Sequence, residues 1–228
     1  MILIKKYPYT FGYTIMKYIC IEGNIGAGKT TLVKLLAQRL HATSLFEKFE
    51  DNPFLPIFYK DPARYAFPVE LHFLMERHRQ LKRYLIDSDL FSSVILADYC
   101  PQKSIIFARE TLEEREFRLF KGLFSELLQY IPKPDTIFFI NRDREWLRQS
   151  IQSRGRSYEM DMDDAYLSKV QQSYLSTFKT LQEQSVIWIN AGGINFLEDQ
   201  KSLERLSSML LSSYNKGIQF VDFQKEAI

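Results

Sequence analysis

The chain of 228 residues is long enough for one α/β domain with a full hydrophobic core. Its 30 basic and 28 acidic residues leave a net charge of +2, which gives no electrostatic argument for binding a nucleic acid polymer or a membrane. No apolar run has the length of a signal peptide or a membrane span. The two cysteines lie in apolar stretches without metal-ligand spacing, so we expect a reducing, cytoplasmic setting.

The first predicted strand, residues 18–21, runs into a glycine-rich turn that matches the phosphate-binding pattern G-x-x-x-x-G-K-[ST]. The motif consists of Gly23, Asn24, Ile25, Gly26, Ala27, Gly28, Lys29 and Thr30. Apolar residues from 32 to 40 then recur at helical spacing. A turn between a strand and a helix aims backbone N–H groups and the positive helix end at one point, which predicts an anion site. Lys29 would reach the outer phosphates of a nucleotide, and the Thr30 hydroxyl would bind Mg²⁺.

Strands and helices are expected to alternate through the rest of the chain. Apolar strands are predicted at 44–46, 93–97, 136–140 and 186–189, and the strand at 186–189 is expected to be the last of the chain. Helices are predicted at 64–85, 113–130, 145–153, around the apolar positions 167–181, and at 203–211. Continuously apolar strands that alternate with helices indicate a parallel sheet covered on both faces. We expect one doubly wound α/β domain at 17–214, with an N-terminal extension at 1–16 and a C-terminal tail at 215–228.

Three kinds of P-loop protein compete for this pattern: a small-molecule kinase, a regulatory GTPase, and a motor or transport ATPase. A GTPase would carry an Asn-Lys-x-Asp guanine reader, but the only Asn-Lys pair, Asn215-Lys216, is followed by Gly-Ile. A motor or transport ATPase would be larger or carry a partner-coupling segment. A small kinase needs a carboxylate as proton acceptor, mobile arginines and an acceptor pocket, because phosphoryl transfer depends on positioning and charge stabilisation.

Candidates for the carboxylate and the arginines follow predicted elements. Glu47 and Asp98 each come after a strand, and ligands of doubly wound sheets bind at the carboxyl ends of the strands. Glu47 and Asp98 should therefore meet the P-loop in one crevice. Arg154 and Arg156 flank Gly155 after a helix, which suggests a lid that closes over phosphates. An exposed helix end would also suit these cations, and Asp98 would also suit a helix cap or a turn.

The motifs resemble those of the deoxynucleoside kinase family from about Lys17 to the final helix, which implies a P-loop kinase fold. Residues 23–31, through Thr31, are similar to the family's P-loop. Residues 47–54 resemble the bacterial segment Glu-Pro-Val-Glu-x-Asn-Pro, whose first glutamate is the general base, here Glu47. Residues 59–67 resemble the stretch whose tyrosine binds the sugar 3′-hydroxyl, here Tyr59.

Three further segments carry the resemblance. Arg154-Gly-Arg156-x-x-Glu159 resembles the lid, whose trailing glutamate also meets the 3′-hydroxyl. The stretch at 190–196 resembles the adenine-holding loop before the last helix and contributes Asn195 and Phe196. Glu70 falls where the family places a base-reading glutamine, and Arg77 falls at a helical arginine of the same pocket. A spacing of seven puts Glu70 and Arg77 on one helix face.

The sequence departs from the family pattern at several of these positions. The triplet Asp/Glu-Arg-Ser after the third strand reads Asp98-Tyr99-Cys100, so its arginine is missing, and Lys103 is a candidate replacement by charge alone. Ser150 replaces the first arginine of the lid, and Asn195 stands where an aspartate is common. Glu70 replaces the glutamine. As a carboxylate, Glu70 offers only acceptors, which favours the two adjacent donors of guanine unless Arg77 or Lys103 pairs with it.

Residues and resemblance together lead to one expectation, with two alternatives. The chain would transfer a phosphoryl group from ATP, with Mg²⁺ on Thr30 and Asp98, to the 5′-hydroxyl of a deoxyribonucleoside. A purine would be favoured, deoxyguanosine first and deoxyadenosine next. The resemblance implies a homodimer. A nucleoside monophosphate kinase is the first alternative, since Arg77 and Lys103 offer cations to a second phosphate. An ATP-binding module without activity is the other.

Overall fold

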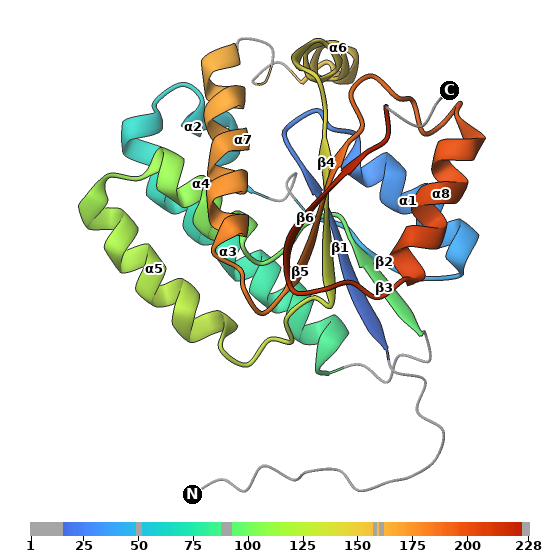
Figure 1. Cartoon of the computed structure of the whole chain (residues 1–228). Coiled ribbons are helices and arrows are strands. Elements are labelled where there is room, and N and C mark those ends of the chain that lie inside the picture. The colour runs from blue at the N-terminus through green and yellow to red at the C-terminus, as the bar shows by residue number, and fades with distance from the viewer. Residues whose placement is uncertain (1–15, 49–51, 88–92, 157–158, 160–161, 225–228) are drawn as a thin grey trace, which may run out of the picture.

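A parallel sheet lies at the centre of the molecule (Figure 1). The computed structural model describes residues 16–48, 52–87, 93–156, 159 and 162–224. Within these residues the sheet has six strands, in the order β2-β3-β1-β4-β5-β6. They are β1 (Lys17–Gly23), β2 (Thr43–Leu45), β3 (Val94–Ala97), β4 (Thr136–Asn141), β5 (Ser185–Asn190) and β6 (Gly217–Asp222). The predicted doubly wound α/β fold is confirmed.

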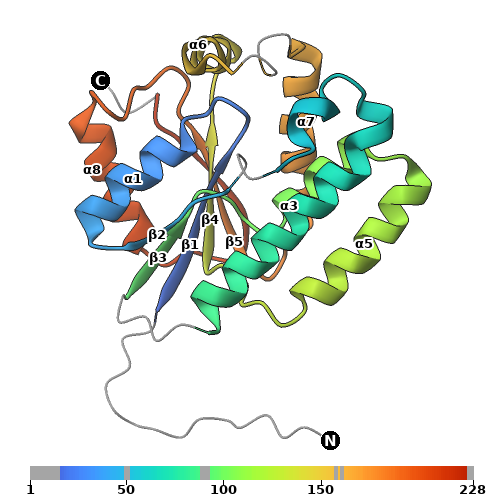
Figure 2. The same cartoon turned by 180° about the vertical axis from the view of Figure 1, so that it is seen from behind.

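Helices cover both faces of the sheet (Figures 1 and 2). They are α1 (Lys29–Leu40), α2 (Leu55–Phe58), α3 (Pro62–Leu85), α4 (Lys103–Thr111), α5 (Glu114–Leu128), α6 (Arg144–Arg154), α7 (Asp164–Lys179) and α8 (Gln200–Leu211). Helices α1 and α8 pack on one face, and α3, α4 and α7 pack on the other, with α5 outside them. None of the helices in the described ranges is long and apolar enough to cross a membrane.

The strands are continuously apolar because helices cover both faces of the sheet. Successive residues of β1 point to opposite faces. Ile19 and Ile21 join the core beneath α1 and α8, whereas Tyr18 and Cys20 join the core beneath α3, α4 and α7. All four side chains are buried. A strand buried on both sides must be apolar at every position rather than at alternate ones, which is why the pattern was legible in the sequence.

Three elements were missed by the sequence analysis, the short helix α2, the helix α4 and the strand β6, and the predicted last strand at 186–189 is corrected. β6 lies in residues that were expected to form a C-terminal tail, and it pairs in parallel with β5 along its whole length. It escaped notice because it is an edge strand, half-buried for the most part, with Phe220 exposed. The helix α4 has nine residues, too few for a clear helical period. The expected N-terminal extension lies outside the described residues, apart from Met16.

Candidate active site

The P-loop joins β1 to α1, and the side chain of Asn24 within it fixes its conformation through hydrogen bonds. Asn24 donates its side-chain N–H to the backbone oxygen of Leu167 at 2.7 Å and accepts from the N–H of Ile25 at 2.8 Å. Gly26 has a φ of +80°, and a Cβ there would lie 2.7 Å from the backbone oxygen of Leu147 in α6. The buried Asn24 side chain therefore shapes the loop, and Gly26 allows α6 to approach it. The motif predicts that backbone N–H groups of this loop bind phosphate.

Lys29 lies folded over this loop. Its Nζ donates to the carbonyl oxygens of Gly23 at 2.9 Å and Asn24 at 3.0 Å. Burial and, to a smaller extent, the positive charge of Lys103 lower the pKa of Lys29 to about 8, against the opposite effect of nearby carboxylates. An incoming phosphate would supply the negative charge that this partly desolvated ammonium lacks.

Strand pairing brings Asp98 next to the P-loop helix. In the register of β1 and β3, Cys20 lies opposite Ala97, so the carboxyl ends of both strands meet at one edge. The Thr30 hydroxyl donates to Asp98 Oδ2 at 2.6 Å, and the backbone N–H of Glu47 donates to Asp98 Oδ1 at 2.7 Å. The structure thus places the P-loop, Asp98 and Glu47 in one crevice, as the strand-end argument predicted.

Glu47 is held between two cations. Arg77 of α3 donates from Nε to Glu47 Oε1 at 2.7 Å, and Lys103, the first residue of α4, forms an ion pair with Glu47 Oε2. Arg77 also donates from Nη1 to the hydroxyl of Ser104 at 2.8 Å. Burial alone would raise the pKa of Glu47, but Arg77 and Lys103 outweigh it and lower the pKa to about 2. Glu47 is therefore ionised at every physiological pH.

Glu70 lies on the same helix as Arg77 but does not pair with it. Among the described residues, neither Arg77 nor Lys103 forms an ion pair with Glu70, because both are engaged by Glu47. The Thr111 hydroxyl lies 3.1 Å from Glu70 Oε1 and 3.0 Å from the carbonyl oxygen of Phe107. One hydroxyl hydrogen cannot serve both oxygens. Donation to Glu70 suits the carboxylate, whereas donation to the carbonyl leaves Thr111 to accept from a protonated Glu70.

The protonation state of Glu70 is balanced near neutrality. The pKa of Glu70 is raised to about 7, chiefly by burial and also by the charge of Glu47, against the lowering effects of Arg77, the Thr111 hydroxyl and Lys103. Glu70 is 4% exposed, so solvent screens these effects poorly. A buried carboxyl with a pKa near 7 is typical of a functional position.

The carboxylates and cations open onto a cavity of about 420 Å³, here called the acceptor cavity. Its walls include Glu47, Tyr59, Glu70, Phe73, Arg77, Lys103, Phe107, Thr111, Glu159 and Tyr166. A concave space with a few convergent polar groups and aromatic walls suits one small ligand. Residues 49–51 of the motif that begins at Glu47 lie outside the described part of the chain.

The predicted lid begins where α6 ends. Arg154 is the last residue of α6, and Gly155 follows with a φ of +67°, which ends the helix. Arg154 and Arg156 both reach Glu159, at 3.4 Å and 2.9 Å. Glu159 therefore holds the two arginines here and faces the acceptor cavity at the same time. Ser157, Tyr158, Met160 and Asp161 lie outside the described residues.

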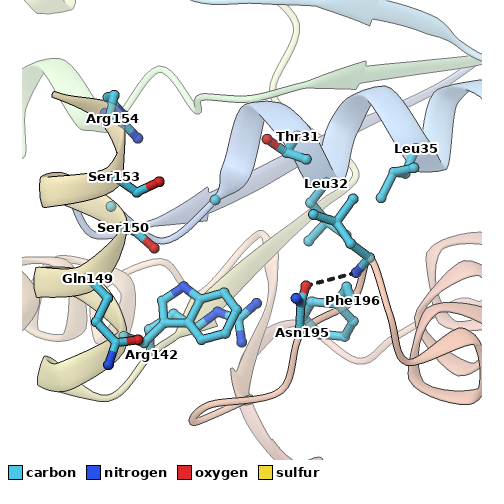
Figure 3. Close-up of a pocket in the computed structure, with 14 residues that line it drawn as sticks. Thr31, Leu32, Leu35, Arg142, Gln149, Ser150, Ser153, Arg154, Asn195 and Phe196 are labelled. Atoms are coloured by element: carbon cyan, nitrogen blue, oxygen red, sulfur yellow. Dashed lines mark hydrogen bonds between the residues drawn. The ribbon is translucent and has the colours of Figure 1, made fainter. Parts of the chain in front are cut away.

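A second cavity of about 510 Å³, here called the donor cavity, lies across the P-loop (Figure 3). Figure 3 shows Gln149, Ser150, Ser153 and Arg154 of α6 along one side and the loop that carries Asn195 and Phe196 on another. Residues Thr31, Leu32 and Leu35 of α1 close a third side. Three residues line both cavities: Gly26, Thr31 and Arg154.

Arg142 and Trp146 form the floor of the donor cavity, and sequence reasoning missed both. The Arg142 guanidinium lies over the Trp146 ring at 4.2 Å and over the Phe196 ring at 5.0 Å. Burial lowers the pKa of Arg142 to about 10. Neither Arg142 Nε nor Trp146 Nε1 has a hydrogen-bond partner in the part of the chain that the structure describes. Arg142 directly follows β4, so the strand-end rule that found Asp98 would also have found it.

Asn195 uses its side chain inside its own loop. Its Oδ1 accepts the backbone N–H of Leu197 at 3.1 Å, which is the dashed line in Figure 3. The acceptor cavity has missed residues as well: Thr111 and Tyr166 had no signal in the sequence, because only the packing of α4 and α7 brings them to α3.

Fold and site together define a class. A P-loop at the carboxyl edge of a parallel sheet, with one cavity on each side and an arginine, Arg154, lining both, defines a phosphotransferase of the P-loop kinase type. The sequence profile described as Deoxynucleoside kinase matches residues 19–212. The chain belongs to the deoxynucleoside kinase family and is a kinase that uses a nucleoside triphosphate to phosphorylate a deoxynucleoside in salvage.

Relatives agree with this placement. The chain is 33% identical over 198 residues to the deoxyguanosine kinase of Bacillus subtilis (strain 168), covering 84% of this chain and 94% of that protein. It is 26% identical to the deoxyadenosine/deoxycytidine kinase of the same organism, covering 85% and 91%. The structure of deoxyadenosine kinase from M. mycoides with bound dATP superimposes with a TM-score of 0.72 at 20% identity, covering 86% of this chain and 100% of that one, and shows the shared fold.

Proposed function

We propose that the chain transfers the γ-phosphoryl group of ATP to the 5′-hydroxyl of a deoxyribonucleoside held in the acceptor cavity. One observation carries this proposal. The hydrogen bonds from Thr30 through Asp98 to Glu47 connect the phosphate-binding loop to the acceptor cavity without a gap. In this arrangement Lys29 and the P-loop amides bind the triphosphate, and Arg154 and Arg156 neutralise the transferring group. Turnover assays with the four deoxynucleosides and their monophosphates test the proposal.

Mg²⁺ fits the oxygen atoms at the mouth of the P-loop. Thr30 Oγ1 and Asp98 Oδ2 are hard ligands 2.6 Å apart, and Mg²⁺ is usually held by one or two protein groups together with substrate phosphates. The described residues contain no cluster of three or more His, Cys, Asp or Glu side chains that could hold a metal alone. When bound, the ion would neutralise charge on the phosphate oxygens.

Glu47 is the proposed proton acceptor, and its partners argue against a monophosphate as the substrate. Arg77 and Lys103 were the cations that could have met a second phosphate, but both are bound to Glu47. Lys103 reaches the carboxylate from the position five residues after Asp98, which supports its role in place of the missing arginine of the triplet. The alternative monophosphate kinase would need those cations free.

Replacing Glu47 by glutamine is expected to lower kcat by about 10²-fold, at the lower end of the usual range for loss of a general base. The lower end is expected because a carboxylate with a pKa near 2 is a weak base. Deoxynucleoside binding, measured by calorimetry, should persist. A variant that loses binding but keeps kcat would show that Glu47 only positions the substrate.

We further propose that the preferred acceptor is a purine deoxynucleoside, with deoxyguanosine first and deoxyadenosine next. As a carboxylate, Glu70 can accept from both N1–H and the 2-amino group of guanine. Adenine and cytosine present one amino donor beside an acceptor, which leaves one polar group unmatched at a cost of about 1–3 kcal/mol. The pairing of Arg77 with Glu47 leaves Glu70 available to the base. The name of the Bacillus subtilis deoxyguanosine kinase points the same way.

The preference for deoxyguanosine over deoxycytidine is expected to fall by about ten-fold as the pH is lowered from 8 to 6. This is the change in the ionised fraction of the Glu70 carboxyl if its pKa is about 7. The carboxylate predominates at pH 8, and the protonated acid, which loses an acceptor, predominates at pH 6. The ratio of the two kcat/KM values is measured, because titrations that affect both substrates cancel in it.

The charged and titratable groups around Glu70 that could complicate this profile are Glu47, Tyr59, Arg77, Lys103, Glu110 and Tyr166. Glu70→Gln is the matched control, since it keeps the size and removes the titration. Its selectivity ratio should be flat with pH. A wild type that prefers deoxycytidine at pH 8, or a ratio that does not change on substitution, would show that Glu70 does not read the base.

We also propose a homodimer and a cytoplasmic setting. The apolar side chains Met75 of α3 and Leu119 of α5 are 48% and 59% exposed on neighbouring helices, which is consistent with a helical interface. The mass in solution, measured by light scattering, tests the dimer. The free thiols of Cys20 and Cys100 are buried, which suits a reducing compartment and can be tested by cell fractionation.

A further inference from the structure

The chain continues past the region that the family profile matches. That region ends at residue 212, and β6 begins at Gly217. Every residue of β6 has a partner in β5, from Gly217 opposite Ser185 to Asp222 opposite Asn190. Phe223 then donates its N–H to the carbonyl oxygen of Asn190 at 3.0 Å. The pairing therefore delivers Phe223 to the point where the loop of the donor cavity begins.

Phe223 packs directly against that loop. Its side chain is 2% exposed and belongs to the core beneath α1 and α8. The rings of Phe223 and Phe196 meet edge to face, with centroids 6.0 Å apart and planes at 75°. The Arg205 guanidinium of α8 covers the Phe223 ring at 4.1 Å. Removing the ring would leave Phe196 without support on this side.

The opposite side of the loop rests on Arg142. Its guanidinium lies 5.0 Å from the centroid of Phe196, and its Nη1 donates to the carbonyl oxygens of Gly192, at 3.3 Å, and of Ile194. Gln224, the residue after Phe223, also approaches Gly192: a Cβ on Gly192 would lie 1.7 Å from Gln224 Nε2. The loop is thus held between Arg142, which lines the donor cavity, and Phe223 with Gln224, which do not.

We propose that Phe223 is a positioning residue for the phosphate donor: it holds Phe196 and residues 191–197 in the conformation that receives the base of a nucleoside triphosphate. Phe223 does not touch the cavity, so its effect passes through Phe196. The inference rests on the proposed function only in taking the cavity beside Phe196 as the donor site. It assigns the segment after the family-matched region a role in donor binding.

The test compares Phe223→Leu and Phe223→Ala with Phe178→Leu and Phe178→Ala. Phe178 is an equally buried phenylalanine of α7 in the core on the other face of the sheet, away from both cavities. ATP affinity is measured by calorimetry, and KM values for ATP and deoxyguanosine are measured with kcat. The Phe223→Ala variant should weaken ATP binding by about 2- to 30-fold, the range for residues that act on a site without touching it. Phe223→Leu should restore part of the loss.

The KM for deoxyguanosine should change by less than the KM for ATP, and the Phe178 variants should leave ATP binding unchanged. If Phe223→Ala fails to fold, Phe223→Leu decides the question. Unchanged ATP binding in the folded Phe223 variant, or an equal loss in both KM values, would overturn the inference. A wild type that binds ATP but phosphorylates no deoxynucleoside would refute the proposed function alone, because the calorimetric comparison does not depend on turnover.

Discussion

Replacing Arg154 by alanine is expected to lower kcat by about 10³–10⁵-fold, the effect of arginines that act on a transferring phosphoryl group. This equals about 4–7 kcal/mol of barrier. Arg154 lines both the donor and the acceptor cavity, so its guanidinium lies where the group must pass from one to the other. Arg156 lines the acceptor cavity and not the donor cavity, so Arg156→Ala should have a smaller effect on kcat.

Steady-state kinetics and deoxynucleoside binding by calorimetry together check this expectation. Both variants should lower kcat more than they change deoxynucleoside affinity. The arginines act on the phosphoryl group during its transfer, so their loss affects the transition state rather than deoxynucleoside binding. Arg144→Ala is the matched control, since Arg144 is an exposed arginine in the first turn of the same helix and lines neither cavity. If both lid variants behave like the wild type, Arg154 and Arg156 are simply cations at a helix end.

Replacing Lys29 by alanine is expected to abolish turnover, with a loss of at least about 10²–10³-fold, as for removal of one preorganised donor. Lys29 also supports the loop, because its Nζ donates to the carbonyl oxygens of Gly23 and Asn24. Some loss of stability is therefore expected, and the Tm must be measured with kcat. Lys29→Met, which keeps the aliphatic stem, separates the charge from the packing.

The pH dependence offers a second test of Lys29. Burial lowers its pKa to about 8, so the ammonium is charged below pH 8 and neutral above it. The affinity for ATP should fall as the pH rises through 8 in the wild type and should lose this dependence in Lys29→Met. Lys201→Ala, at an exposed position of α8, provides a control for loss of a surface charge. Near-normal activity of a folded Lys29→Ala variant would refute the P-loop assignment.

The sequence argues against a GTPase, because the guanine reader is absent. The alternative of an inactive ATP-binding module depends on the missing arginine of the triplet after β3. Lys103 forms an ion pair with Glu47 from the start of α4, a helix that was not predicted. We propose that this charge replaces the missing arginine, since a contact depends on positions in space rather than on sequence spacing.

The sequence alone determined most of the local elements and the edge of the sheet at which the site lies. The P-loop could be read because glycine spacing, an apolar strand and a helical period coincide within a few turns of chain. Glu47 and Asp98 could be placed because parallel strands carry their carboxyl ends to one edge. The spacing of Glu70 and Arg77 correctly put both on the buried face of α3, where they are 4% exposed each.

Only the tertiary structure decided which of these groups pair. Arg77 turned to Glu47 rather than to Glu70, because strand pairing and the docking of α3 bring residues 30 positions apart within hydrogen-bonding distance. Burial then raised the pKa of Glu70 and the two cations lowered that of Glu47. β6 likewise depends on its neighbour: its half-exposed residues lack a continuous apolar pattern, and its ladder with β5 defines it. Local patterns encode elements, whereas charges, ladders and cavities arise from contacts between segments that the linear order keeps apart.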